Sequence, residues 1–179
     1  IRKEYGNFLL SSMKTLFKTN VEGLKFLLDA FEIASRKHPE FVYLIVGKGE
    51  AVKELQDYID SKGLQEKAKI IDKILSFDER QEVWAATAIS PHAFFFEFSI
   101  GISLMEYMAF GNACVVIDVG NVKNFVQDSA MVVKPDVNSM AEGMEELMEN
   151  ESLRNSLKKK SAELIRENYS VEAVAERLV

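Results

Sequence analysis

Short apolar runs alternate with longer amphipathic stretches along the whole chain. Each run has the length of a strand, and a strand that is apolar throughout is typical of a parallel sheet covered by helices on both faces. The pattern predicts strands at residues 8–10, 41–46, 69–71, 88–90, 113–117 and 131–133.

The stretches between these runs carry apolar residues at helical spacing. Leu24, Leu28 and Phe31 recur every three or four positions, and Pro39 marks the end of that helix. Helices are predicted at residues 21–36, 50–62, 79–86, 102–110, 122–127, 140–149, 153–168 and 171–178. Strands that alternate with helices form right-handed crossovers. We therefore expect one α/β domain over residues 1–179: a doubly wound, mainly parallel, Rossmann-like sheet of about six strands with helices on both faces.

The composition is typical of a soluble globular protein, with 47% apolar and 28% charged residues. No apolar run approaches the roughly 20 residues that cross a bilayer, and the first residues lack the apolar core of a secretory leader. The missing initiator Met suggests a piece of a longer protein. We expect a cytoplasmic protein whose full-length form could lie at the periphery of a membrane.

Charge and cysteine usage exclude several kinds of site. Cys114 is the single cysteine of the sequence, so no internal disulfide can form. The sequence has only two histidines, His38 and His92, so a Cys/His zinc site is excluded. The net charge of -6 argues against a nucleic-acid partner. No Asp-x-Asp pair follows a predicted strand, so we expect neither a metal site nor a cofactor.

Ligands of doubly wound sheets bind at the loops that follow the strands, and residues 11–20 form the first such loop. Lys18 lies just before the predicted helix start, where backbone N–H groups favour an anion such as phosphate. The alternative is that Thr19 and Glu22 form a capping box and that Lys18 is merely solvated.

Two further loops and one histidine carry weaker signals. A tight turn explains the glycines at 47 and 49 better than a ligand does, because a lone G-x-G pattern is weak. Residues 118–121 also favour a turn at the same sheet edge. His92, after Pro91, could donate to a phosphate or a sugar, but a surface histidine is the favoured interpretation.

The segment from Glu97 to Gly111 is the strongest candidate. Glu106 lies one turn into a predicted helix that is otherwise apolar, and an unpaired buried carboxylate is costly. Ser103 and Glu106 match the S-x-x-E capping box. Alternatively, Glu106 accepts hydrogen bonds from ligand hydroxyls while the amides from Gly101 to Ser103 hold an anion. Glu97 is either a second site carboxylate or an exposed loop acid.

Several motifs in one order carry a family resemblance. Residues 44–49 read LIVGKG, residues 106–111 read EYMAFG and residues 115–120 read VVIDVG. With these motifs the chain resembles the C-terminal, donor-binding domain of GT-B fold retaining glycosyltransferases (group 1, family 4-like). The resemblance spans essentially the whole chain, and E-x-M-A-x-G at Glu106–Gly111 is its most specific element.

The resemblance implies a nucleotide-diphosphate sugar as donor. Glu106 would hold the ribose hydroxyls, Glu97 the sugar, and the amides beside Gly101 together with Lys18 the diphosphate. Catalytic roles are implied for Glu97 and Lys18. The implied donor-binding set is Ser12, Met13, Lys14, Lys18, Ile71, Asp72, Lys73, Glu97, Gly101, Ile102, Ser103 and Glu106. The implied partners are the nucleotide sugar, an N-terminal GT-B domain absent from this chain, and an acceptor that could be membrane-associated.

The sequence departs from the family pattern at two places. Eight residues separate Glu97 from Glu106 instead of seven, and Ser12-Met13 stands where the family has Gly-Arg, so that Lys14 would have to replace the arginine. These departures keep open a degenerate, non-catalytic nucleotide-binding or partner-interaction module. A dehydrogenase is disfavoured because no G-x-G-x-x-G follows the first strand. We expect this chain alone to bind a nucleotide sugar weakly and not to transfer sugar at a useful rate.

Overall fold

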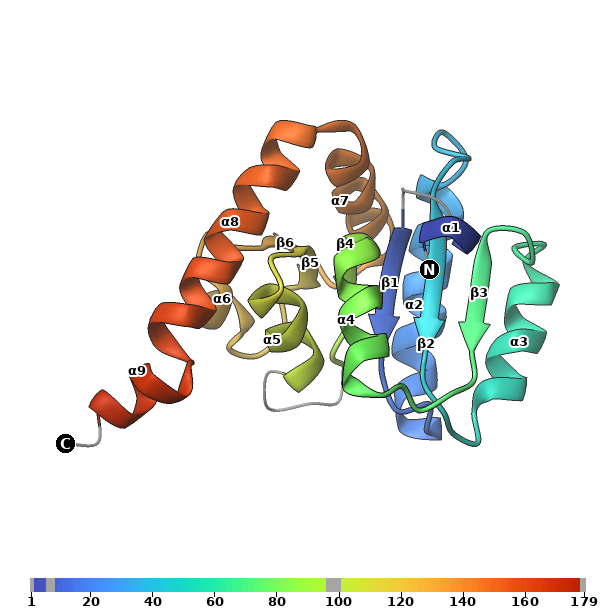
Figure 1. Ribbon diagram of the computed structural model, residues 1–179. Coiled ribbons are helices and arrows are strands. Elements are labelled where there is room, and N and C mark those ends of the chain that lie inside the picture. Colours follow the sequence, from blue (N-terminus) through green and yellow to red (C-terminus); the bar gives the residue numbers. More distant parts are fainter. Residues whose placement is uncertain (1, 6–8, 96–100, 178–179) are drawn as a thin grey trace.

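A six-stranded sheet forms the centre of the computed structural model, which describes residues 2–5, 9–95 and 101–177 (Figure 1). All five neighbouring strand pairs are parallel, and the order is β3-β2-β1-β4-β5-β6. The strands are β1 (Leu9–Met13), β2 (Val42–Val46), β3 (Ala68–Ile71), β4 (Thr87–His92), β5 (Ala113–Ile117) and β6 (Met131–Val133). The predicted doubly wound α/β class is confirmed.

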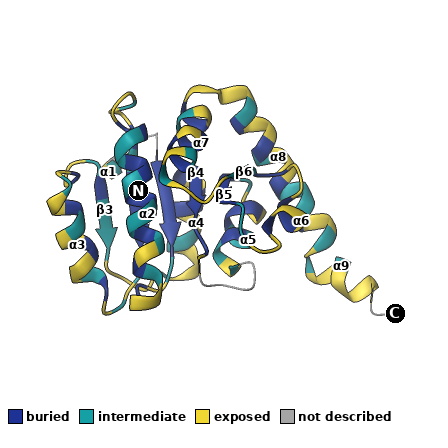
Figure 2. Cartoon of the chain, turned by 180° about the vertical axis from the view of Figure 1, so that it is seen from behind, coloured by how far each residue is buried: buried dark blue, intermediate teal, exposed yellow. Residues whose placement is uncertain are grey.

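Helices cover both faces of the sheet, and their buried sides face it (Figure 2). The described helices are α1 (Arg2–Tyr5), α2 (Lys18–Ala34), α3 (Val52–Ser61), α4 (Phe77–Ala86), α5 (Ile102–Ala109), α6 (Val122–Val126), α7 (Val137–Glu149), α8 (Glu151–Asn168) and α9 (Val171–Glu176). One core cluster joins the sheet to α2, α3 and α7, and a second joins it to α4, α5 and α6. The end of α8 and α9 extend away from the sheet (Figure 1).

The continuous apolar runs follow from this two-sided burial. In β5, Ala113, Val115 and Ile117 pack into the first cluster, whereas Cys114 and Val116 pack into the second. Successive side chains of a strand point to opposite faces, so both sets must be apolar. Runs of this kind made the strands predictable from the sequence.

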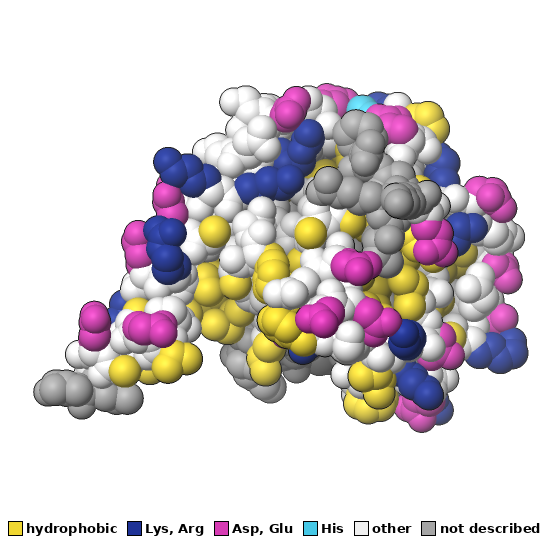
Figure 3. Space-filling view, viewed as in Figure 1, with side chains coloured by type: hydrophobic (Ala, Val, Ile, Leu, Met, Phe, Trp, Pro, Cys, Tyr) yellow, Lys and Arg dark blue, Asp and Glu magenta, His cyan; other side chains and the backbone are white. Residues whose placement is uncertain are grey.

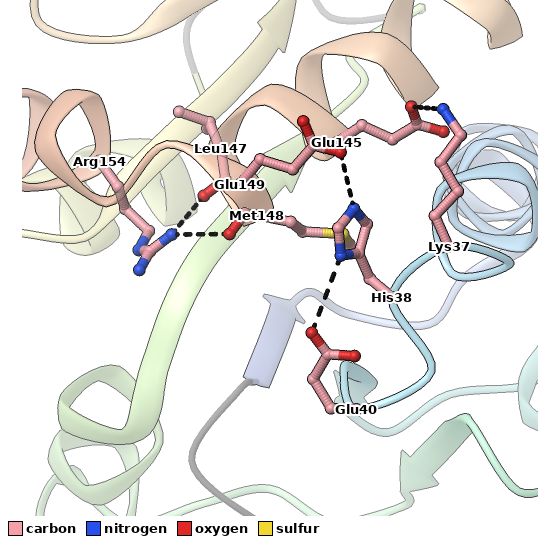
Figure 4. A network of polar contacts seen from close by, with 8 residues as sticks. All are labelled: Lys37, His38, Glu40, Glu145, Leu147, Met148, Glu149 and Arg154. Carbon is pink, nitrogen blue, oxygen red and sulfur yellow. Dashed lines mark hydrogen bonds and ion pairs between the residues drawn. The ribbon is translucent and has the colours of Figure 1, made fainter.

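Polar contacts hold the packing of α7 at its C-terminal end (Figure 4). Arg154 Nη1 donates to the carbonyls of Leu147 and Met148 at 2.6 and 3.1 Å. These carbonyls belong to the last turn of α7, where helix carbonyls lack intrahelical partners. Lys37, which follows α2, pairs with Glu145 of α7 at 2.7 Å. The contacts join α7 to α8 and to the segment after α2.

The strand order creates a ligand-binding crevice. From β1 the chain proceeds through β2 to β3 on one side, and from β4 through β5 to β6 on the other. The two directions diverge between β1 and β4, and such a point leaves a crevice outside the carboxyl ends of the strands. In Figure 1 the arrows of β1, β2 and β3 all point toward this edge.

Two expectations about local structure are wrong. The helix α2 begins at Lys18 with Phe17 as its N-cap and no side-chain cap hydrogen bond, so Thr19 and Glu22 form no capping box. The strand β4 continues through Pro91 to His92, and His92 is only 1% exposed, so it is not a surface histidine. The parallel register of β4 with β5 extends to this residue, which places it in the interior.

Candidate functional site

A cleft of about 780 Å³ lies at the carboxyl ends of the central strands. Its walls come from the loops after β1, β2 and β3, from the end of β4 and from the first turn of α5. The lining residues are Met13, Lys14, Thr15, Asn20, Val46, Gly47, Lys48, Lys73, Ile74, Leu75, Arg80, Phe94, Gly101, Ile102, Ser103 and Glu106. Figure 3 shows hydrophobic side chains around α4 and α5 on the lower half of this face. The cleft occupies the position expected for a ligand of a doubly wound fold.

The first turn of α5 faces this cleft without a side-chain cap. Its N-cap is Gly101, an extended residue, and no side chain within residues 2–5, 9–95 and 101–177 caps the turn with a hydrogen bond. The alternative in which Ser103 and Glu106 form a capping box is therefore wrong. Both Ile102 and Ser103 line the cleft. Since the first N–H groups of a helix have no intrahelical partner, this turn can receive an anion.

Glu106 pairs with Arg80 of α4 across the cleft wall. The distance from Arg80 Nη1 to Glu106 Oε1 is 3.1 Å, and the Glu106 side chain keeps 31% of its surface exposed. Burial raises the pKa of the Glu106 carboxyl, and the Arg80 charge partly opposes that rise. A half-buried carboxylate beside one arginine retains acceptor capacity for hydroxyl groups of a ligand.

A chain of buried hydroxyls fixes the position of α5 on the sheet. Tyr107 OH lies 2.7 Å from Ser11 Oγ, which lies 2.6 Å from Thr87 Oγ1. The Thr87 hydroxyl donates its proton to the Val83 carbonyl, so it accepts from Ser11. Since Ser11 donates to Thr87, it accepts in turn from Tyr107. Burial raises the pKa of Tyr107, so its hydroxyl keeps the proton that this bond requires. The chain joins α5, β1 and β4.

The hydroxyl of the neighbouring Ser12 also makes its hydrogen bonds inside the core. Its hydroxyl donates to the Pro91 carbonyl at 3.0 Å and accepts from Tyr43 OH at 2.9 Å. Only 1% of Ser12 is exposed, and it does not line the cleft. The pair Ser11-Ser12 therefore ties three strands together.

His92 lies behind the cleft wall as a neutral side chain. Ser90 donates its proton to the Ser11 carbonyl, so the 3.0 Å contact between His92 Nε2 and Ser90 Oγ requires an Nε2 proton. Burial, and then the charge of Lys14, hold the pKa of His92 well below its usual range. Its ring stacks on Phe94, and Lys14 Nζ lies 4.5 Å from the Phe94 ring centroid. His92 thus supports the aromatic ring over which Lys14 is placed.

The glycines after β2 allow two loops to approach closely. A Cβ at Gly47 would lie 1.8 Å from the Lys14 carbonyl oxygen, and one at Gly49 would lie 2.2 Å from that of Leu16. The backbone N–H of Leu16 donates to the Lys48 carbonyl at 3.2 Å. These glycines are therefore required for the close packing of the two loops, and this packing places both Gly47 and Lys48 on the cleft.

Comparison with known proteins decides the family. The model of the family "Glycosyl transferases group 1" matches residues 4–164. The chain belongs to this family. It is 24% identical over 168 residues to the alpha-D-kanosaminyltransferase of Streptomyces kanamyceticus, covering 88% of this chain and 41% of that protein.

Solved structures share the fold of this glycosyl transferase chain. The sucrose-phosphate synthase of Thermosynechococcus elongatus superposes with a TM-score of 0.83 at 17% identity, over 99% of this chain and 46% of the other. An Anabaena protein in complex with UDP and glucose gives 0.81 at 18% identity, over 99% and 50%. The chain therefore spans half or less of the length of these relatives.

The cleft of this glycosyl transferase domain brings together part of the predicted donor-binding set. The members that line it are Met13, Lys14, Lys73, Gly101, Ile102, Ser103 and Glu106. Lys18 is exposed as the first residue of α2, and Ile71 and Asp72 end β3 and begin the next loop; none of the three lines the cleft. Glu97 lies outside the described residues. Residues 118–121 form a turn that does not line the cleft, with Asp118 paired to Lys123 at 2.5 Å.

Sequence reasoning missed Arg80 and Phe94 as cleft residues. Ser76 and Glu79 carry the S-x-x-E pattern and form the reciprocal capping box that starts α4. This signal would have placed the helix start at Phe77 instead of 79 and Arg80 in the first turns beside the cleft. Phe94 offered no comparable signal, because an aromatic run fits a core as well as a cleft.

Two general findings complete the description. Within residues 2–5, 9–95 and 101–177, no three His, Cys, Asp or Glu side chains gather closely enough to hold a metal ion. None of the helices in those ranges combines the length and the apolar character needed to cross a membrane.

Proposed function

We propose that this chain is the donor-binding domain of a glycosyltransferase that moves a hexose from a nucleotide-diphosphate sugar to an acceptor. The observation that carries the proposal is one cleft that holds the Glu106 carboxylate, the uncapped first turn of α5 and the Lys14 ammonium. A carboxylate suits vicinal ribose hydroxyls, and a helix N-terminus beside a lysine suits a diphosphate.

In this proposal each wall of the cleft meets one part of the donor. Glu106 accepts from the ribose hydroxyls, while the amides of Ile102 and Ser103 and the ammonium of Lys14 meet the diphosphate. The loop that contains Lys73, Ile74 and Leu75, which line the cleft, would meet the base. Charge that develops on the leaving diphosphate would be stabilised by these preorganised groups.

Two further residues keep the roles that the family resemblance implies. Glu97 is proposed to contact the donor sugar, as the resemblance implies. Lys18, one turn before the buried Val21 in α2, would have to reach the diphosphate from the helix surface, so we propose a smaller contribution from Lys18 than from Lys14. No metal ion is needed in this scheme, since lysines and helix amides meet the charge.

Transfer is proposed to require a longer protein. The family relatives are at least twice the length that this chain covers, which is consistent with a second domain that supplies the acceptor side. We propose an N-terminal GT-B domain for this part, acting in the cytoplasm on an acceptor that could be membrane-associated. The isolated chain should then bind a nucleotide without useful transfer.

Calorimetric titration of UDP, GDP and ADP, each alone and as its glucose conjugate, tests the proposal on the wild-type chain. Saturable binding of at least one of these nucleotides is expected. If none binds at millimolar concentration, the proposal is wrong and a non-catalytic interaction module becomes the better account.

A further inference from the structure

The guanidinium of Arg80 packs against two aromatic rings of its own helix. Its guanidinium carbon lies 5.6 Å from the Phe77 ring centroid and 5.5 Å from that of Trp84. These residues recur at intervals of three and four along α4, so they share one face of the helix. Trp84 is itself fixed, because it is 1% exposed and stacks on Phe110 at 4.3 Å. A guanidinium that stacks on aromatic rings keeps its donors in a defined plane.

The helix that carries Arg80 also has a rigid start. The Ser76 hydroxyl accepts from the Glu79 amide, and the Glu79 carboxylate accepts from the Ser76 amide. Lys73, on the cleft, pairs with the same carboxylate at 2.5 Å. The first turn of α4 is therefore anchored to the loop that lines the cleft, and Arg80 has little freedom to leave it.

The geometry at Glu106 is one-sided. Arg80 contacts Oε1, and among the described residues no hydrogen bond to Oε2 is found. We propose that Arg80 is a positioning residue for ribose recognition: it holds Glu106 through Oε1 and leaves Oε2 aimed at the vicinal hydroxyls of a nucleotide. This inference rests on the proposed function. It gives a role in the site to Arg80, which lies outside the sequence motifs.

The charges around Glu106 favour the same role. Arg80 is the cation in contact with the carboxylate, while Lys14, Lys48 and Lys73 line the rest of the cleft. Burial disfavours the ionised carboxyl, and Arg80 opposes that effect. Arg80 thus favours the ionised carboxylate against part of the effect of burial and also orients it, and both effects strengthen hydrogen bonds from hydroxyls.

Paired titrations separate positioning from simple attraction. The probes are UDP and 2′,3′-dideoxy-UDP, or the corresponding GDP or ADP pair if that base binds better to the wild type. Loss of a positive charge weakens the binding of both probes equally. Loss of the positioning of Glu106 weakens only the binding of UDP, which carries the ribose hydroxyls. For Arg80→Gln we expect the ratio of the two affinities to fall about tenfold, a typical coupling between residues in contact. The acid limb of UDP binding should move to higher pH, because Glu106 loses the cation that lowers its pKa.

Matched variants make the result decisive. Arg36→Gln removes an exposed arginine paired with Glu32, away from the cleft, and should leave the ratio unchanged. Should Arg80→Gln fail to unfold cooperatively, Arg80→Lys replaces it, and the ratio should still fall because lysine lacks the planar fork. If the wild type binds UDP more tightly than 2′,3′-dideoxy-UDP and the Arg80 variant shows the same ratio of affinities, this inference is wrong and the proposed function still stands. A wild type that binds no nucleotide overturns the proposed function, and this inference with it.

Discussion

The Tyr107 hydroxyl donates a 2.7 Å hydrogen bond to Ser11 and so joins α5 to the centre of the sheet. Tyr107 is the neighbour of Glu106 in the chain, and the two side chains leave the helix in different directions. One is fully buried, and the other lines the cleft. The position of the candidate ribose-binding carboxylate is therefore set by a hydrogen bond made on the buried side of the same helix.

Tyr107→Phe removes this donor and leaves the ring in place. We expect the free energy of unfolding to fall by about 1 kcal/mol, the usual net value of one buried hydrogen bond. Chemical denaturation measures this change. Tyr169→Phe is the control, because Tyr169 is 38% exposed and the variant keeps its ring contact with Phe125, so it should cost less. An equal loss in both variants would contradict the account of α5.

His92→Phe should change the pH dependence of stability. The folded pKa of His92 lies well below the unfolded value of about 6.5, so on acidification the unfolded chain takes up a proton that the folded chain does not. The wild type should lose about 1 kcal/mol more than His92→Phe for each pH unit below about 6.5, until the folded pKa is reached. Denaturation curves at pH 7.5, 6.5 and 5.5 compare the two slopes, and parallel slopes would refute a buried neutral histidine.

Much of the fold was predictable because strands that are buried on both faces are apolar at nearly every position. The runs at β2 and β5 are apolar throughout, and all six strands appear close to their expected positions. The limits of elements were less predictable. Pro91 and His92 read as a loop, but their neighbours in β1 and β5 supply partners that a sequence pattern does not contain.

The candidate site was predictable only where local spacing determines it. Glu106 and the α5 amides come from one helix, so their spacing alone brings them together. Arg80 comes from another helix, and only the packing of α4 beside α5 places it at Glu106. S-x-x-E patterns begin at both Ser76 and Ser103, and the structure uses the one at Ser76 as a capping box, whereas Gly101 caps α5.

Lys14→Ala and Lys18→Ala should differ in their effect on nucleotide binding. Lys14 lines the cleft beside Phe94, whereas Lys18 is exposed on α2. A charge-assisted hydrogen bond to phosphate contributes enough that its loss weakens binding about tenfold or more. We expect that loss for Lys14→Ala and a change of less than about threefold for Lys18→Ala. The reverse order in calorimetric titrations would assign the diphosphate to Lys18 and show that α2 presents its first turn to the ligand.

The central claim is that Glu106 binds the ribose of a nucleotide in the cleft, and titration of UDP, GDP and ADP into Glu106→Ala tests it most directly. The nucleotide that binds the wild type should bind this variant at least about tenfold more weakly, because hydrogen bonds to a charged carboxylate are lost. Glu163→Ala, which removes an α8 glutamate paired with Lys159 outside the cleft, should bind like the wild type. Equal affinity of wild type and Glu106→Ala would contradict the account.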